Sequence, residues 1–390
     1  MKYRDFGKTG FKVSALGFGA MRLPTKDKKP MGEKIDAKAA ARMVLKAIDG
    51  GVNYYDTAYM YHGGKSESFL GRVLQGGLRD EVKIATKCPV YMVKKPTDFD
   101  KLLSTQLKRL RTDHVDFYLF HGLCGKTWKE IVLRHRLLKR AEAALKDGRI
   151  GHIGFSFHDD LKAFKTIVDG YDGWEFCQIQ YNYMDVKNQA GTEGLRYAAS
   201  KGLGVVIMEP LLGGRLSNPP EGLRRQLKAN GKRLEPSDLA LQWVWDQPEV
   251  STILSGMTEM KHVTGNLESA GRSGAGTLTK AKRQAVEKAR VWYNERTLVP
   301  CTGCSYCMPC PHKVNIPSNF EEYNLGYMHD DLKGARMIYA RFFNTKSKAS
   351  ACKKCGKCEP KCPQKIPIRE RLEEVDTVLG KGRPYPKRKA

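Results

Sequence analysis

Val115–His121 reads VDFYLFH, and segments of this kind decide the fold of the chain. The segment is short and apolar on both faces, so we predict a buried parallel strand over Val115–Phe120 that needs cover on both sides. His121 follows as its polar end. Seven other segments share this pattern, namely Ala15–Gly19, Val52–Thr57, Val82–Thr86, Ile150–Phe155, Phe176–Gln180, Gly204–Met208 and Ser251–Leu254.

Amphipathic stretches lie between these strands and predict helices. Ser237 is expected to cap one of them and Gly148 to end another. Eight strand–helix units over about 250 residues predict an α/β fold of the (β/α)8 TIM-barrel type. A doubly wound sheet is disfavoured, because no Gly-x-Gly-x-x-Gly follows the first strand. The predicted helices are Ala37–Asp49, Phe99–Leu110, Leu133–Lys146, Gly191–Lys201 and Ser237–Asp246.

A hairpin is predicted in front of the barrel. Tyr3–Phe6 and Val13–Leu16 have strand composition, and Gly7–Gly10 between them has the composition of a turn. We expect this hairpin to plug the barrel floor.

The last quarter of the chain carries two runs of four cysteines, each ending in Cys-Pro. Three thiolates at two-residue spacing bind one cubane cluster, and a detached fourth completes it. The two runs therefore predict two [4Fe-4S] clusters. In two-cluster ferredoxins the fourth thiolate of each cluster often comes from the opposite run. Two zinc sites, each with a full set of cysteine ligands, are the alternative, which the triple spacing and the trailing prolines disfavour. The predicted ligand sets are Cys301, Cys304, Cys307 with Cys362, and Cys352, Cys355, Cys358 with Cys310.

The residues around the cysteines have helical patterns. Lys280–Thr297 predicts a helix that leads into the cysteine region, and Asn319–Phe343 is helix-like between the two runs. This favours a mainly helical iron–sulfur domain. The predicted organisation is a barrel at 1–275, a linking helix at 276–298, a helical ferredoxin-like domain at 299–380, and a basic, disordered tail at 381–390.

The composition is that of a globular protein with a core, since 41% of the residues are hydrophobic. No run of about 18 apolar residues occurs, so no membrane span is predicted. The N-terminus has no apolar signal core. Cluster thiolates require reducing conditions, and we therefore expect a cytoplasmic protein.

The formal net charge is +26, from 68 Lys and Arg against 42 Asp and Glu. Such a charge fits an acidic partner, and nucleic acid, an anionic membrane surface and an acidic electron carrier all qualify. A solvated basic surface without a partner is an equally weighted alternative. No nucleic-acid motif is present, so no specific nucleic-acid binding is predicted. The clusters favour a carrier such as a ferredoxin or flavodoxin.

Polar residues close three consecutive predicted strands. Asp56 ends the second, Lys87 the third and His121 the fourth, and Tyr61 stands in the loop after Asp56. Active sites of these barrels lie at the C-terminal strand ends. A phenol has a pKa near 10 and needs a nearby cation to release its proton, a role that fits Lys87 held by Asp56. With His121 orienting the reacting oxygen, this is a site for protonating a carbonyl while hydride reaches its carbon.

Each of these four residues, taken alone, also has a purely structural explanation. A buried Asp–Lys pair and a loop tyrosine usually serve packing, but four such residues in this order favour a catalytic site. Three segments around them resemble the aldo-keto reductases, and the resemblance extends over about Met1–Ala270. They are Gly51–Tyr61, Ile84–Lys87 and Asp116–His121.

The resemblance implies a catalytic tetrad with Tyr61 as general acid, and a nicotinamide cofactor, NADPH or NADH, across the barrel mouth. It places the nicotinamide carboxamide near Ser156 and Gln178. The pyrophosphate falls on the glycine-containing loop after strand seven and the adenosine on the next loop and helix, a location that suits phosphates in any case. The residues implied are Glu209, Leu211 and Gly213 for the pyrophosphate, and Ser255, Gly256, Thr258 and Asn266 for the adenosine.

The sequence departs from the family pattern at the nucleotide. Gly256 and His262 stand near positions where members that use NADPH present Lys and Arg, although Lys261 is a possible substitute. Gly265 stands where an adenine-contacting Glu is common. No aromatic residue ends strand seven to stack on the nicotinamide. NADH and NADPH therefore both stay open. The cysteine region resembles helical ferredoxin modules fused to some bacterial and archaeal reductases of the family.

The function predicted is hydride transfer between a nicotinamide and a small carbonyl or alcohol substrate, with clusters that exchange electrons with a carrier. A version with structural or sensory clusters is also open. The alternatives from other classes are a nicotinamide-binding redox sensor or regulatory subunit, and a cluster-bearing nucleic-acid binder. Candidate walls of the substrate pocket, for which packing is the commoner role, are Tyr91, Met92, Trp128 and Tyr183.

Overall fold

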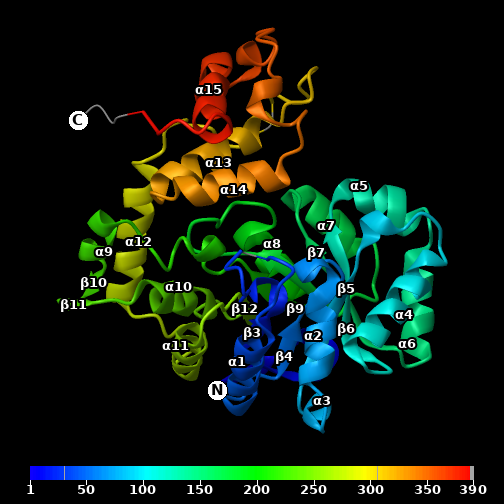
Figure 1. Cartoon of the computed structure of the whole chain (residues 1–390). Helices are drawn as coiled ribbons and strands as arrows, with labels where there is room; N and C mark the ends of the chain where they lie inside the picture. The colour runs from blue at the N-terminus through cyan, green and yellow to red at the C-terminus, as the bar shows by residue number, and fades with distance from the viewer. Residues whose placement is uncertain (30, 305, 387–390) are drawn as a thin grey trace. The chain divides into compact units, whose positions relative to one another are not determined.

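The computed structural model describes residues 1–29, 31–304 and 306–386. Its main feature is a closed barrel of parallel strands in the order β12-β3-β4-β5-β6-β7-β8-β9, which confirms the predicted TIM barrel (Figure 1). The strands are β3 (Leu16–Gly19), β4 (Tyr54–Asp56), β5 (Lys83–Cys88), β6 (Val115–Leu123), β7 (Ile150–Phe157), β8 (Phe176–Gln180), β9 (Gly204–Met208) and β12 (Thr252–Ser255).

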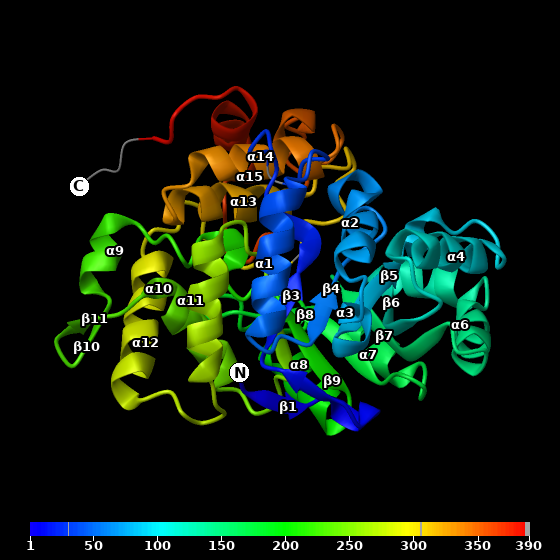
Figure 2. The ribbon, with the colours of Figure 1, turned by 60° about the horizontal axis from the view of Figure 1, so that its bottom comes forward.

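Helices surround the barrel, as Figure 2 shows for α1 and α2 outside β3 and β4. In α1 the buried Ala40, Met43, Val44 and Ala47 recur at three- and four-residue spacing, so one face packs inward. Asp36 caps this helix by accepting from the Ala39 amide. The helices of this layer are α1 (Ala37–Asp49), α2 (Lys65–Val73), α3 (Leu78–Glu81), α4 (Asp98–Leu110), α5 (Gly125–Thr127), α6 (Leu137–Lys146), α7 (Leu161–Asp169), α8 (Gly191–Ser200), α10 (Pro236–Trp245) and α11 (Met260–Gly271).

The predicted hairpin is present, with β1 (Tyr3–Asp5) antiparallel to β2 (Lys12–Ser14). Phe6, in the connection between these two strands, is buried and packs against the rings of Tyr54, Phe117 and Phe176. Position 7, next to Phe6, requires glycine. The φ of Gly7 is 55°, and a Cβ atom added there would lie 2.1 Å from the Gly204 nitrogen. The hairpin therefore closes one end of the barrel, and the polar strand ends lie at the other.

Two predicted helix boundaries were wrong. The helix expected to begin at Leu133 begins at Leu137 as α6, because a π-helical turn at Trp128–Leu133 ends before it and Arg136 lies in the left-handed region between them. The helix expected from Ser237 starts at Pro236, because proline fits the first helical position, where its missing amide hydrogen costs nothing. Gly148, with φ of 80°, follows the end of α6 as predicted.

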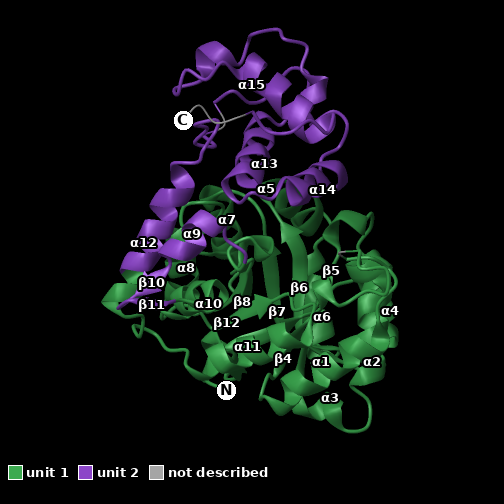
Figure 3. Cartoon of the chain, turned by 60° about the vertical axis from the view of Figure 1, so that its left-hand side comes forward, with its two compact units in different colours: residues 1–217, 234–283 green, residues 218–233, 284–390 purple. Residues whose placement is uncertain are grey.

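The chain forms two compact units, coloured separately in Figure 3. Unit 1 holds residues 1–217 and 234–283, and unit 2 holds residues 218–233 and 284–390. The domain boundaries expected near 275, 298 and 380 stay predictions. Unit 2 contains α9 (Glu221–Gln226), the short strands β10 (Lys228–Ala229) and β11 (Lys232–Arg233), most of α12 (Lys280–Asn294), α13 (Ile316–Met328), α14 (Leu332–Phe342) and α15 (Ile368–Val375).

Unit 2 has a core of its own around Phe320, Tyr323, Tyr339 and Leu372. The stretch expected to be one helix over Asn319–Phe343 is two, α13 and α14, because Asp331 caps a new start by accepting from the Gly334 amide.

The disorder expected for the tail at 381–390 stays a prediction, and of residues 381–386 all but Tyr385 are exposed. There the Tyr385 hydroxyl donates to the Tyr323 carbonyl at 2.9 Å. Residues 387–390 lie outside the described part. In the described residues, no helix is long and apolar enough to cross a membrane.

Candidate active site and cluster sites

Three of the four predicted catalytic residues meet at the ends of β4 and β5. Lys87 is fully buried, and its ammonium donates to Asp56 Oδ1 at 2.6 Å and to the Thr57 carbonyl at 2.8 Å. It also donates to the Tyr61 hydroxyl at 3.3 Å. The parallel register pairs Gly19 with Asp56 and Lys87 with Leu119, so these strand ends share one edge of the barrel. The charged pair thus lies directly behind the phenol.

The environment sets the protonation of this group. Burial alone would lower the pKa of Lys87, but Asp56 and Tyr61 together raise it above its ordinary value, so the ammonium stays charged. Burial raises the pKa of Tyr61, and the Lys87 charge offsets only part of that shift. The expected phenolate stabilisation is therefore present but does not dominate. Tyr61 is a neutral phenol at neutral pH and keeps a proton to donate.

His121 lies beside Tyr61 within the longer-than-expected strand β6. The two ring centroids are 6.1 Å apart at an interplanar angle of 82°. Burial first, and then the Lys87 charge, lower the pKa of His121 to about 3, so the imidazole is neutral. Its Nδ1 atom is buried and has no hydrogen-bond partner in the described residues. A neutral ring with a free nitrogen can bind the oxygen of a polar substrate.

A network behind the tetrad holds Lys87 in place, and sequence analysis missed it. Gln106, on α4, donates to Glu67 at 2.6 Å, to Thr86 at 3.0 Å and to the Lys87 carbonyl at 3.1 Å. The Glu67 side chain is itself fully buried and pairs with Arg109 at 3.1 Å. The hydrogen bonds therefore tie α2 and α4 to the strand that carries the catalytic lysine.

The residues expected at the nicotinamide lie on neighbouring strands. Ser156 and Gln178 are a registered pair of β7 and β8. Ser156 accepts from the Gly122 amide at 2.8 Å, while Gln178 Oε1 is buried without a partner in the described residues. The NH2 group of a nicotinamide carboxamide can donate a hydrogen bond to this buried oxygen, which otherwise lacks a donor. These residues therefore fit a nicotinamide.

The loop expected at the pyrophosphate, which contains Leu211, has four residues with positive φ, among them Glu209 with φ of 53° and Gly213 with φ of 67°. The Glu209 carboxylate accepts from the Gly213 amide and lies 3.6 Å from the Arg22 guanidinium. Arg22 comes from the turn after β3, and the sequence analysis did not single it out. It is a cation beside the loop where a diphosphate is expected, so the charges fit such a group.

The residues expected at the adenosine lie at the end of β12, in the loop after it and within α11. Asn266 donates to Ser255 at 2.8 Å, and both side chains are buried. An added Cβ at Gly256 would lie 2.8 Å from Arg22, so only glycine fits there unless the arginine moves. The Thr258 amide donates to His262 at 3.3 Å. Lys261, the possible substitute cation, is exposed and pairs with Glu259 at 2.8 Å.

The four candidate pocket walls divide into two pairs. Tyr91 and Met92 are exposed, and the Tyr91 ring lies 6.5 Å from His121. Trp128 and Tyr183 are buried against Trp174 and Trp243, so packing explains them.

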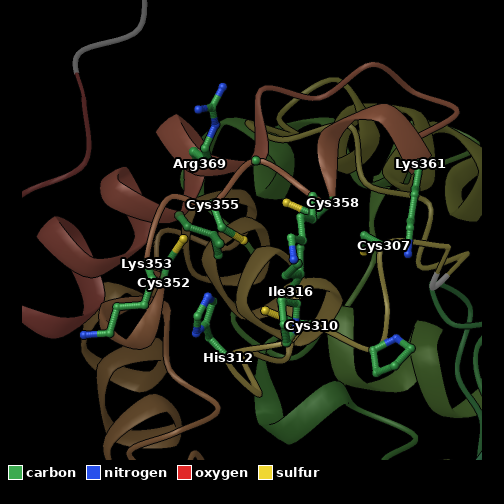
Figure 4. Close-up of a pocket in the computed structure, with 15 residues that line it drawn as sticks. Cys307, Cys310, His312, Ile316, Cys352, Lys353, Cys355, Cys358, Lys361 and Arg369 are labelled. Atoms are coloured by element: carbon green, nitrogen blue, oxygen red, sulfur yellow. The ribbon is translucent and has the colours of Figure 1, made fainter.

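The cysteines of unit 2 line two cavities. The four thiols of the first predicted set line one of them together with Ile316, Phe320, Ile366 and Ile368. The four thiols of the second set line a larger cavity of about 350 Å³ (Figure 4). Figure 4 shows the sulfur atoms of Cys310, Cys355 and Cys358 facing the same space.

The thiols surround these cavities without closing on a single ion. In the described residues, no three His, Cys, Asp or Glu side chains are arranged to hold one metal ion. A zinc site needs four sulfur atoms that each lie about 2.3 Å from the metal ion. The four sulfur ligands of a cubane cluster surround a larger group and lie farther apart. The all-cysteine donor sets that line the two cavities fit iron–sulfur clusters. Cys307 lines both cavities, so the two sites adjoin.

The eight-stranded barrel thus carries Asp56, Lys87 and His121 on its strands and Tyr61 in the segment after β4. The Aldo/keto reductase family model matches residues 15–273, and the chain belongs to this family. A 4Fe-4S dicluster domain model matches residues 300–366. The protein is an oxidoreductase of the family with a C-terminal 4Fe-4S ferredoxin domain.

Similar proteins agree with this assignment. L-galactose dehydrogenase of Arabidopsis thaliana is 30% identical over 68% of this chain and 87% of its own length. A probable voltage-gated potassium channel subunit beta of the same plant is 26% identical over 69% of this chain and 90% of its own. The structure of aldo-keto reductase AKR11C1 from Bacillus halodurans (holo form) superposes with a TM-score of 0.59 at 24% identity, covering 74% of this chain and 96% of that one.

Proposed function

We propose that the barrel reduces, or reversibly oxidises, a small carbonyl or alcohol substrate with Tyr61 as the general acid. The observation that carries this is the contact of the buried Lys87 ammonium with both Asp56 and the Tyr61 hydroxyl. A bound nicotinamide, NADH or NADPH, would supply the hydride, held by Ser156, Gln178 and the loops that carry Glu209 and Ser255.

The four tetrad residues divide the work on the substrate oxygen. The Tyr61 hydroxyl donates a hydrogen bond to the carbonyl oxygen and passes its proton there as negative charge develops. Lys87 sits 3.3 Å behind the phenol oxygen and stabilises the charge that remains on it. Asp56 holds the ammonium. His121, neutral and with Nδ1 unpartnered in the described residues, orients the same oxygen.

The test is Tyr61→Phe, which removes the phenolic hydroxyl that donates the proton and keeps the aromatic ring. We expect kcat for carbonyl reduction to fall about 10²–10⁴-fold, the usual worth of a general acid. Dinucleotide affinity, read from fluorescence quenching, should stay within about twofold, since the phenol lies at the substrate.

Tyr59→Phe is the matched control. Tyr59 lies two residues away and packs its ring against Arg109 at 4.2 Å, and its hydroxyl has no partner in the described residues. Full turnover by Tyr61→Phe would remove Tyr61 as the acid.

The second part of the proposal is that unit 2 holds two [4Fe-4S] clusters that exchange electrons with an acidic carrier. Two adjoining cavities, each lined by the four thiols of one predicted set, with Cys307 reaching the second cavity as well, support the pair of clusters. Anaerobic purification should give about eight irons per chain. Adding NADH or NADPH under the same conditions and recording the electron paramagnetic resonance signal shows whether the nicotinamide reduces them.

A regulatory subunit is the second candidate function. The observation in its favour is the similarity to two plant proteins named probable voltage-gated potassium channel subunit beta. Dinucleotide binding without turnover on a broad panel of aldehydes and ketones would favour it. Turnover that depends on Tyr61 would favour the enzyme.

A further inference from the structure

The two cluster cavities differ sharply in charge. Among the described residues, no Lys, Arg, His, Asp or Glu lines the cavity of Cys301, Cys304, Cys307 and Cys362. The cavity lined by the second set carries Lys353, Lys357, Lys361, Arg369 and His312 at its walls, and in the described residues no carboxylate lines it. One cluster site is therefore apolar, and the other has a cationic border.

Three lysines of this border are available to a partner. Lys353, Lys357 and Lys361 are exposed, and each stands next to a ligand cysteine in the chain. None of the three has an ion-pair partner among the described residues, whereas Arg369 pairs with Glu359 at 2.8 Å. Cys355, between Lys353 and Lys357, is itself exposed. The lysine border (Lys353, Lys357 and Lys361) thus surrounds a cluster site that reaches the surface.

We infer that an acidic one-electron carrier protein docks on the lysine border and exchanges electrons through the cluster held by Cys310, Cys352, Cys355 and Cys358. The inference rests on the proposed function of unit 2. In the step itself no bond forms or breaks: the reduced carrier loses one electron and the oxidised cluster gains it. The cluster at the apolar site receives electrons from its neighbour, because Cys307 and Ile316 line both cavities.

Elementary electrostatics supports both the docking of an acidic carrier on the lysine border and the entry of electrons through the cluster beside it. Unpaired cations around an exposed site attract an acidic partner and raise association rates by about 10- to 10³-fold at low salt. Cations also stabilise the reduced cluster, which carries one more negative charge, and so raise its reduction potential. The apolar site gives its cluster neither effect, so the border marks one cluster as the external one.

The test uses the full-length holoprotein and an acidic plant-type [2Fe-2S] ferredoxin as the probe. Lys353→Gln, Lys357→Gln and Lys361→Gln are combined in one variant. The control variant combines Lys288→Gln, Lys333→Gln and Lys346→Gln, three exposed lysines without ion pairs in the described residues that line neither cavity. Both variants lose three charges, so only position differs.

Electron exchange is followed by rapid mixing at low and at high salt. Reduced probe is mixed with oxidised protein, and oxidised probe with reduced protein, so that one of the two directions runs downhill. We expect the border variant to slow the downhill exchange at least about tenfold at low salt and to flatten its salt dependence. The control variant should behave as wild type. Equal rates in all three proteins, or equal loss in both variants, would overturn the inference.

A redox titration of the two cluster signals locates the entry point. The border variant should lower the reduction potential of the cluster held by Cys310, Cys352, Cys355 and Cys358 by more than that of its neighbour, since Lys361 also precedes Cys362 of the other set. Equal shifts of the two potentials, or no shift of either, contradict the assignment. A short RNA or DNA duplex that binds in place of the ferredoxin, with the same dependence on the border, would also overturn it. Iron content and carbonyl turnover of the same preparations report separately on the proposed function.

Discussion

Tyr61 and His121 are both neutral at pH 7, although their pKa values move in opposite directions. Burial raises the pKa of Tyr61 and lowers that of His121 to about 3, because in each case it disfavours the charged form. The Lys87–Asp56 pair then carries the formal charges of the tetrad. Two neutral donors in front of a buried ion pair suit a substrate oxygen that is uncharged at first and gains charge during reaction.

This arrangement predicts the pH dependence of the enzyme. The imidazole of His121 stays deprotonated as the pH falls from 8 to 5, since its pKa of about 3 lies below that range. We therefore expect that titration of His121 causes no change in kcat/KM for the best carbonyl substrate between about pH 5.5 and 8.5.

His121→Asn supplies the comparison. It should lower kcat/KM while leaving the shape of the profile unchanged, because the wild-type imidazole does not titrate in that range. An acid limb near the ordinary histidine pKa that this substitution abolishes would show that His121 titrates after all.

At the scale of elements, the position of Lys87 depends on contacts between β5, α2 and α4. The amide of Gln106 makes three hydrogen bonds there, and its carbonyl oxygen accepts from Tyr118 at 2.7 Å. Buried Glu67 depends on it for one of its partners. Loss of the amide leaves several buried polar groups unpaired, which is costly in the low-dielectric interior.

Gln106→Leu should therefore lower the free energy of unfolding of the barrel by about 1–3 kcal/mol or somewhat more. It should also reduce carbonyl turnover, because the Lys87 carbonyl loses a donor. Urea unfolding followed by circular dichroism measures the stability. Gln75→Leu is the control: Gln75 is exposed and makes one hydrogen bond, to the Gly71 carbonyl, so its loss should change stability by no more than about 0.5 kcal/mol. Equal effects of the two substitutions would contradict the role of the network.

The limits of prediction from sequence follow from the same elements. The barrel strands could be predicted because they are apolar on both faces, and Asp56, Lys87 and His121 because each is a polar residue that closes an apolar run in the sequence. Helix α2 was missed because its buried face includes Ser66 and Glu67, which look like surface residues until Thr86 and Arg109 are seen beside them.

Residues that act through distant partners were invisible for the same reason. Gln106 has the sequence setting of an exposed helical glutamine, and Arg22 has no motif around it. Only the folded chain brings Arg22 within 3.6 Å of Glu209, which lies far along the sequence. Local patterns predict elements and strand ends, whereas long-range polar contacts require the fold.

At the scale of the whole molecule, the two units have separate cores. The barrel packs about residues such as Phe117 and Phe176, and unit 2 about Phe320, Tyr339 and Leu372. Six of the eight cluster cysteines pack against the core of unit 2: Cys301, Cys307, Cys310, Cys352, Cys358 and Cys362. Cluster binding and the folding of unit 2 are therefore coupled, because thiolates without iron would have to be neutralised or exposed.

Removing the iron should destabilise unit 2 and spare the barrel. We expect the holoprotein to show two calorimetric transitions, of which anaerobic treatment with a strong iron chelator lowers or abolishes one. Dinucleotide affinity should stay within about twofold, because the residues that fit the nucleotide belong to unit 1. Iron and sulfide added back should restore the lost transition, which excludes irreversible damage. If chelation lowered the barrel transition and the dinucleotide affinity together, the two units would share their stability, and the clusters would be structural supports of the active site itself.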